Sequence, residues 1–225
     1  MQGPSHLLVS WFLAESVDVP SARDRRIIAW AGFAPDIDVV AYVAAIVYYR
    51  FDQERAFENV WSVVHHRYTH GLFFVAIVAV LAGFLADRRP GATGPPRVAV
   101  IAALAAALHC FFDVVAGGPT WPIYPFWPLT DAHWSVPWSW TIGEWPNIAI
   151  LYCAIAGALA YGWRVGYSPM ECFGDRADRW LVGVLRQERV ASAAGATRQR
   201  IIIWICVLAV VIAILIPLRA MFFGA

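Results

Sequence analysis

Hydrophobic and polar residues follow one another along this chain in long blocks. Four blocks carry no charged residue: Gly71–Ala86, Val98–Leu108, Ile148–Trp163 and Ile201–Leu218. The second has only 11 residues but extends to about Pro119 when His109 and Asp113 are included. Each block then approaches or reaches the roughly 17–25 residues with which a helix crosses a bilayer. We therefore predict an all-α fold, a polytopic transmembrane helical bundle with about five or six membrane helices. A buried soluble core is the weaker alternative.

Breaks between the apolar segments predict the remaining elements. A short apolar helix is expected at about 4–16, and a second apolar segment, 27–49, is interrupted at Gly32–Pro35. Proline is tolerated in a first helical turn but is disruptive inside a helix, so a new helix should begin near Pro35. The further elements are an amphipathic stretch at 51–66, helices at 71–87, about 97–115, 146–163 and 201–219, and a Trp/Pro-rich loop at 117–145.

An Arg-rich polar segment, 164–200, separates the last two predicted helices, and within it Arg176–Val190 has the pattern of a helix lying along the membrane surface. Loop 117–145 has no basic residue other than His133. By the positive-inside rule, segment 164–200 is cytoplasmic and loop 117–145 lies across the membrane. We see no internal repeat and treat 1–225 as one integral-membrane domain, with the chemical motifs in 1–128.

Composition supports a membrane protein, because 60% of the 225 residues are hydrophobic and only 15% are charged. The net charge of +1 gives no support to nucleic-acid binding. The start MQGPSHLLVSWFLAE has no basic region, so no cleaved signal peptide is expected. The cysteines show no CxxC spacing and are interpreted as small core residues: Cys110, Cys153, Cys172 and Cys206.

The most unusual polar residues form the run HHRYTH at 65–70, directly before an apolar block. His66 and His70 are four residues apart, and so are His109 and Asp113. On a helix, such pairs project from one face at roughly 5–6 Å between Cβ atoms, within reach of one cation. Mixed His and carboxylate ligands are typical of Zn²⁺.

The two pairs are also predicted to lie at similar depth. At a rise of roughly 1.5 Å per residue, His70 and Asp113 lie about 26 Å and 24 Å from the turn that joins their antiparallel helices. Each residue alone has a simpler reading, a packed histidine or an aspartate that complements a helix dipole. Together with Asp36 and Asp38 they favour a metal site, since ionisable groups at membrane depth are costly to keep.

The other histidines are less certain. His6 stands in an apolar context near the chain start and is a further candidate ligand. On a helix His65 would point away from His66, and His133 lies in a loop where it can be a surface group.

Four motifs in order, GPSHLL, APDID, HRYTH and HCFFDVVAGGPTWPIYPF, resemble those of the bacterial membrane-bound metal-dependent hydrolases, a group that includes a LexA-regulated inner-membrane member. They cover about residues 3–128. The resemblance implies a bacterial inner-membrane location and the metal ligands His6, Asp36, Asp38, His66, His70, His109 and Asp113, with Arg67 beside them. The HRYTH run is one residue shorter than the family pattern, which leaves open whether His65 or His66 is the equivalent ligand. Gly71 stands where the family tends to have serine.

We expect a metal-dependent hydrolase with one or two divalent ions, Zn²⁺ first and Mn²⁺ or Fe as alternatives. The expected substrate is a phosphoester of a lipid or lipid-linked molecule, so membrane lipids are the expected partners. Arg67, whose guanidinium matches phosphate, and Asp38 are the catalytic candidates. The site is expected at the non-cytoplasmic face.

Other functions were weighed. A metal-ion or small-solute transporter would use the same His/Asp groups, and a purely structural protein would bind no metal. No HExxH protease motif and no full set of desaturase histidine boxes is present. The six tryptophans of loop 117–145 fit an interfacial aromatic belt or an apolar lid over the site.

Overall fold

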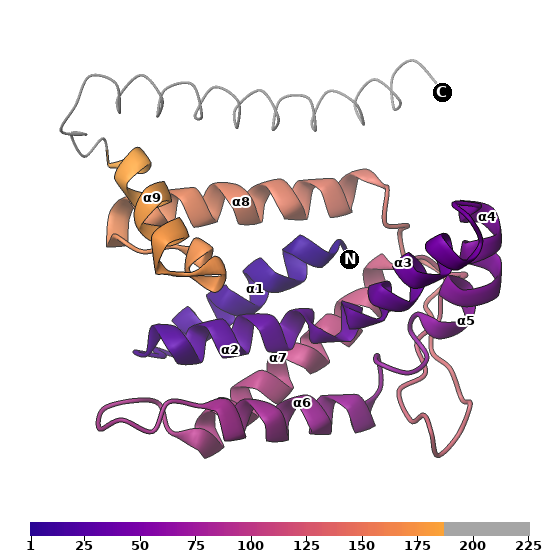
Figure 1. Cartoon of the computed structure of the whole chain (residues 1–225), viewed down its shortest axis with the longest axis horizontal. Coiled ribbons are helices and arrows are strands. Elements are labelled where there is room, and N and C mark those ends of the chain that lie inside the picture. Colours follow the sequence, from indigo (N-terminus) through magenta and orange to yellow (C-terminus); the bar gives the residue numbers. More distant parts are fainter. Residues whose placement is uncertain (187–225) are drawn as a thin grey trace.

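The computed structural model describes residues 1–186, and these are mostly helical (Figure 1). The elements are α1 (Gly3–Ser16), α2 (Ala22–Phe33), η1 (Ala34–Asp38), α3 (Val39–Tyr48), α4 (Gln53–Ala56), η2 (Phe57–Trp61), α5 (Ser62–Val64), α6 (Leu72–Leu85), α7 (Pro95–Ala116), α8 (Trp145–Val165), η3 (Pro169–Phe173) and α9 (Asp175–Leu185). Within this part of the chain there is no strand, only an isolated bridge between Ile123 and Trp134. The prediction of an all-α fold is confirmed.

Three described helical segments are long and apolar enough to cross a membrane: Ala22–Tyr48, Pro95–Ala116 and Trp145–Val165. Leu72–Leu85 is apolar but shorter. The structure therefore supports a membrane protein but does not confirm five or six spans. The predicted helix at 201–219 and residues 187–190 of the predicted surface helix lie outside the described residues.

Proline and glycine set the helix boundaries much as the sequence predicts. α7 has two prolines in its first turn, and α8 ends at Gly166, which has a φ of 95°. The break near Pro35 is smaller than predicted. Pro35 lies in the 3-10 turn η1, so α2, η1 and α3 form one continuous apolar segment.

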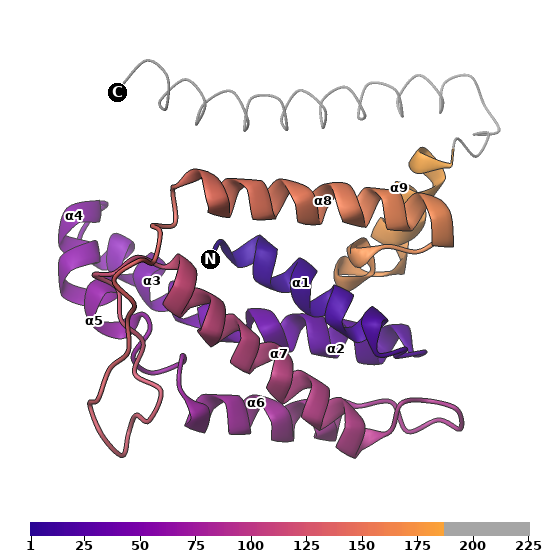
Figure 2. The same ribbon diagram turned by 180° about the vertical axis from the view of Figure 1, so that it is seen from behind.

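The helices pack in a bundle in which α2 lies between α1 and α7, α6 packs on α7, and α8 covers α1 (Figures 1 and 2). Small side chains dominate the buried faces of α7, including Ala102, Ala105 and Ala106. Small residues let helix backbones approach closely, which is how helices associate where there is no water to drive burial.

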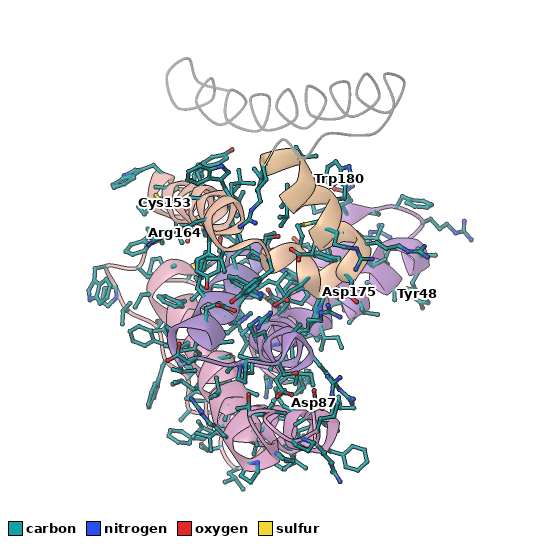
Figure 3. The ribbon with its side chains drawn as sticks, turned by 90° about the vertical axis from the view of Figure 1, so that its left-hand side faces the viewer. Tyr48, Asp87, Cys153, Arg164, Asp175 and Trp180 are labelled. Atoms are coloured by element: carbon teal, nitrogen blue, oxygen red, sulfur yellow. The ribbon has the colours of Figure 1, made fainter. Side chains whose placement is uncertain are left out.

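A buried arginine network closes the end of the bundle near α9. Arg25 donates from Nε and Nη2 to the two carboxylate oxygens of Glu171 at 2.7 and 2.8 Å. Trp11 Nε1 donates to the same carboxylate at 2.7 Å. This end also carries Asp87, Arg164 and Asp175 (Figure 3). The network ties η3 to α1 and α2, so it holds α9 against the bundle.

Candidate metal centre

Side chains from three separate parts of the chain meet at the opposite end of the bundle. Asp36 comes from η1, His70 from the loop before α6, and His109 and Asp113 from the last turns of α7. Each offers one ligand atom, and these four atoms lie within 4.8 Å of one another. We call these four residues the His/Asp cluster.

The pair on α7 has the geometry that its spacing predicts. His109 Nε2 lies 2.9 Å from Asp113 Oδ2, one helical turn along the same face. Both side chains are almost completely buried. Asp113 therefore lies at the centre of the cluster, within 3.3 Å of His70 Nε2 as well.

The other predicted pair meets for a different reason, and the helical spacing assumed for His66 and His70 is wrong. α5 ends at Val64 and α6 begins at Leu72, so the HHRYTH run is a turn. His66 has a φ of 66°, a left-handed conformation that is uncommon outside glycine. This turn, rather than helical spacing, brings the rings of His66 and His70 to 4.5 Å between centroids.

The partner of His109 determines which ring nitrogen faces the cluster. His109 Nδ1 lies 2.7 Å from the carbonyl oxygen of Gly32, which can only accept a hydrogen bond. Nδ1 must therefore carry the proton, and in the neutral ring Nε2 is an acceptor. Pro35 has no N–H, so it cannot donate to the Gly32 carbonyl three residues before it, as a 3-10 turn would otherwise allow.

His70 is oriented by a short relay of side chains. Thr69 Oγ1 donates to Asp38 Oδ2 at 2.9 Å, which uses its only proton. Thr69 Oγ1 must then accept from His70 Nδ1, 3.1 Å away. Burial lowers the pKa of His70, which keeps the ring neutral. Its Nε2 is therefore also an acceptor.

When both rings are neutral, these assignments direct two nitrogen lone pairs at the carboxylates of the cluster, so the centre needs a proton or a metal ion. Without a metal, Asp113 would hold a proton on His109 Nε2, 2.9 Å away. The Nε2 atoms of His70 and His109 are 3.1 Å apart, and Asp36 Oδ1 lies 3.5 Å from the second of them. Acceptors in such proximity repel one another unless a cation lies among them. Histidine nitrogens whose second nitrogen is held by a carbonyl or a carboxylate relay are typical of metal ligands.

Two further histidines border the cluster. His6 Nε2 lies 3.2 Å from Asp113 Oδ1, and its ring stacks on that of His109 at 3.6 Å. His66 Nε2 lies 3.8 Å from Asp113 Oδ2, and its Nδ1 is buried without a hydrogen-bond partner in the described part of the chain. Burial lowers the pKa of His66 well below its usual range, so the ring is neutral and that Nδ1 nitrogen is a candidate ligand atom. The amino group of Met1 also contacts Asp113 Oδ1.

The remaining predicted site residues lie farther out. Asp38 accepts from His65 Nδ1 at 3.0 Å and from Thr69. It therefore positions His70 through Thr69 and is not a member of the cluster. Arg67 does not reach the cluster. After the left-handed residue His66, the guanidinium of Arg67 turns to Asp131, and the Nη2–Oδ1 distance is 2.7 Å. His133 is exposed and stacks loosely on Tyr124, away from the cluster.

A cavity of about 530 Å³ reaches the cluster at Asp36 and Asp113, beside His66. His65, which sequence reasoning left undecided, lines it and stacks on Trp61 at 3.9 Å between ring centroids. Trp121 of the predicted Trp/Pro-rich loop lines the same cavity. Other tryptophans of that loop, among them Trp134, Trp138 and Trp145, are exposed.

Sequence reasoning missed two positioning groups, Thr69 and the Gly32 carbonyl. For Thr69 the available signal was its place beside His70.

The relay predicts that Thr69→Val, which keeps the shape of the side chain, loses the hydroxyl that holds His70 Nδ1. We expect metal affinity to fall roughly 10- to 100-fold, as for other outer-shell partners of histidine ligands. Competition with a chelator measures this, and Thr69→Ser should bind like the wild type. Equal loss in both variants would contradict the relay.

The chain matches the model of a known protein family, described as YdjM inner membrane protein, over residues 1–221. No curated protein and no solved structure matches it. Because the match covers nearly the whole chain, the protein belongs to the YdjM inner membrane protein family. The predicted resemblance is confirmed for the inner-membrane family. The match itself does not support a metal-dependent hydrolase.

Proposed function

We propose that this member of the YdjM inner membrane protein family is a metal-dependent hydrolase. Its substrate is a phosphoester of a lipid or lipid-linked molecule. The observation that carries the proposal is the convergence of four acceptor groups, three of them buried, with two neutral histidines held so that each directs a nitrogen lone pair at the centre. A divalent cation is the partner that such a donor set fits.

The ligand types favour Zn²⁺, with Mn²⁺ or Fe as alternatives. Two imidazole nitrogens and two carboxylates form a mixed nitrogen and oxygen set, which suits these ions better than Mg²⁺ or Ca²⁺. His65, His66 and His70 form a second group of ligand atoms within 4.8 Å. This second group, which shares His70 with the first, could hold a second ion beside it.

A divalent ion held here would supply Lewis acidity, which brings the pKa of water toward neutrality and stabilises charge on phosphoester oxygens. The chain's own residues do the rest. Asp38 and Thr69 hold His70 in position, and the Gly32 carbonyl does the same for His109. The mostly apolar cavity wall lowers the local dielectric beside the cluster, which strengthens electrostatic interactions there.

The distribution of arginine supports a site at the non-cytoplasmic face. Arg50, Arg55 and Arg67 belong to elements near the cluster, whereas the other end of the bundle and its loops are richer in arginine. Its described arginines are Arg23, Arg25, Arg26, Arg88, Arg89, Arg97, Arg164, Arg176, Arg179 and Arg186. By the positive-inside rule, this richer end is cytoplasmic.

The test is elemental analysis of the detergent-purified protein, with assays of lipid phosphoester hydrolysis on the same samples. We expect on the order of one or two divalent ions per wild-type chain that survive desalting. His109→Ala should lose both metal and activity. The matched control is His133→Ala, which removes an exposed imidazole and should change neither.

Each other outcome points elsewhere. Tightly bound metal without hydrolysis of any lipid phosphoester would contradict the proposed activity. Weak, exchangeable metal together with ion flux into proteoliposomes would favour the transporter alternative. A metal-free wild-type protein would contradict the metal centre itself.

A further inference from the structure

The cavity beside the His/Asp cluster has two chemically different ends. Its polar end is formed by Asp36, His65, His66 and Asp113. The rest of the wall is mostly apolar and includes Phe33, Val39, Phe57, Trp61, Trp121 and Ile142. A small polar substrate would leave this apolar wall unfilled, whereas an amphiphile would match both ends.

The mouth of the cavity lies on an apolar surface. Val39, Phe57 and Ile142 line the cavity and are also 39%, 38% and 54% exposed. Val39 begins α3, whose outer face continues with the exposed Val40 and Val43. α3 belongs to the candidate membrane span Ala22–Tyr48, and these exposed valines are the surface that such a span would present to the hydrocarbon of the bilayer. A chain from the bilayer can therefore enter without crossing water.

A second, smaller cavity of about 280 Å³ adjoins the first. The two share Phe57, His65 and Trp121 in their walls, and the rings of Phe57 and Trp121 are 5.5 Å apart. The smaller cavity adds Ser62, Thr120 and Tyr124, whose hydroxyl groups can hydrogen-bond a polar group. The larger, mostly apolar cavity therefore reaches the cluster, and the shared wall that contains His65 joins it to a partly polar one.

We infer that the larger cavity binds the hydrocarbon chain of a membrane amphiphile, with its phosphate at the His/Asp cluster and its polar headgroup toward the smaller cavity. This inference rests on the proposed function for the phosphate, and it names the part of the substrate that gives specificity. Affinity then rises with chain length, because each buried methylene contributes a similar free energy.

The experiment measures equilibrium binding of alkylphosphonates from hexyl to dodecyl by the detergent-purified, metal-loaded protein. Their P–C bond is not hydrolysed, so binding is read without turnover. We expect affinity to rise up to about fourfold per added methylene, from about 0.8 kcal/mol each, until the cavity is filled. Phosphate alone should bind far more weakly than dodecylphosphonate.

Two tryptophan substitutions in the same loop separate the cavity from general adsorption. Ile142→Trp places a large ring at the mouth and should flatten the chain-length dependence. Leu129→Trp adds the same ring at a position that is 90% exposed and does not line the cavity, so it should behave like the wild type. Because detergent and ligand are identical, partition into micelles cancels in this comparison.

The inference is overturned if wild-type affinity does not depend on chain length, or if Ile142→Trp binds the series as the wild type does. Should Ile142→Trp fail to fold, Val39→Trp at the other side of the mouth gives the same test. Failure of this inference can be distinguished from failure of the proposed function. Chain-dependent binding without hydrolysis would leave the cavity assignment standing and remove only the enzymatic activity.

Discussion

Asp113→Asn is expected to remove metal from the protein and to lower hydrolysis by more than about 100-fold, above what the loss of an outer-shell partner costs. The carboxylate lies within 2.9 Å of His109 and 3.3 Å of His70, and it also contacts His6. An amide of the same shape keeps the packing but removes the negative charge on which all three imidazoles converge. It also directs an N–H at an acceptor or at the cation.

Metal content and thermal stability measured together identify the cause. Added Zn²⁺ should raise the melting temperature of the wild type, because a ligand at 100 times its Kd stabilises by about 2.7 kcal/mol. The same addition should leave Asp113→Asn unchanged. Asp131→Asn is the matched control, since it alters an exposed carboxylate paired with Arg67. Zn²⁺ stabilisation that persists in Asp113→Asn would place the metal elsewhere.

Gly32→Ala is expected to have the second large effect, through packing. A Cβ at position 32 would lie 1.7 Å from Ser10 Oγ and 2.5 Å from Ser10 Cβ, so α1 and α2 would have to separate. Overpacking of this kind costs about 1–3 kcal/mol, and sometimes more. We expect the melting temperature to fall by roughly 5–10 °C. Metal binding should weaken too, because the Gly32 carbonyl that holds His109 moves with α2.

Gly157→Ala is the comparison for this effect. Its Cβ would meet Phe12 Cζ at 3.6 Å, an ordinary contact, in the interior of α8. Alanine has the better helix propensity, so this variant should be as stable as the wild type or slightly more stable. Equal stability of the Gly32 and Gly157 variants in thermal unfolding would show that the α1–α2 crossing is not as close as the structure has it.

Much of the fold was predictable because it depends on local rules. Uncharged apolar blocks predicted the helices that became α6, α7 and α8, and prolines and glycines marked their ends within a few residues. The His109 and Asp113 pair was predictable for the same reason, since spacing on one helix determines which side chains share a face. The length of the break near Pro35 was not, because a 3-10 turn can absorb a proline without ending the helical segment.

By itself, the sequence determined the helical class, the membrane character and the residue types that can hold a metal, since each of these follows from composition and spacing. Tertiary structure alone decided how those residues are used. The left-handed backbone at His66 sends Arg67 to Asp131 and lets His66 approach Asp113. The supports of the two central histidines, Thr69 and the Gly32 carbonyl, arise from contacts between segments far apart along the chain. A backbone conformation and a carbonyl direction leave no mark on residue periodicity, so only the packed bundle reveals them.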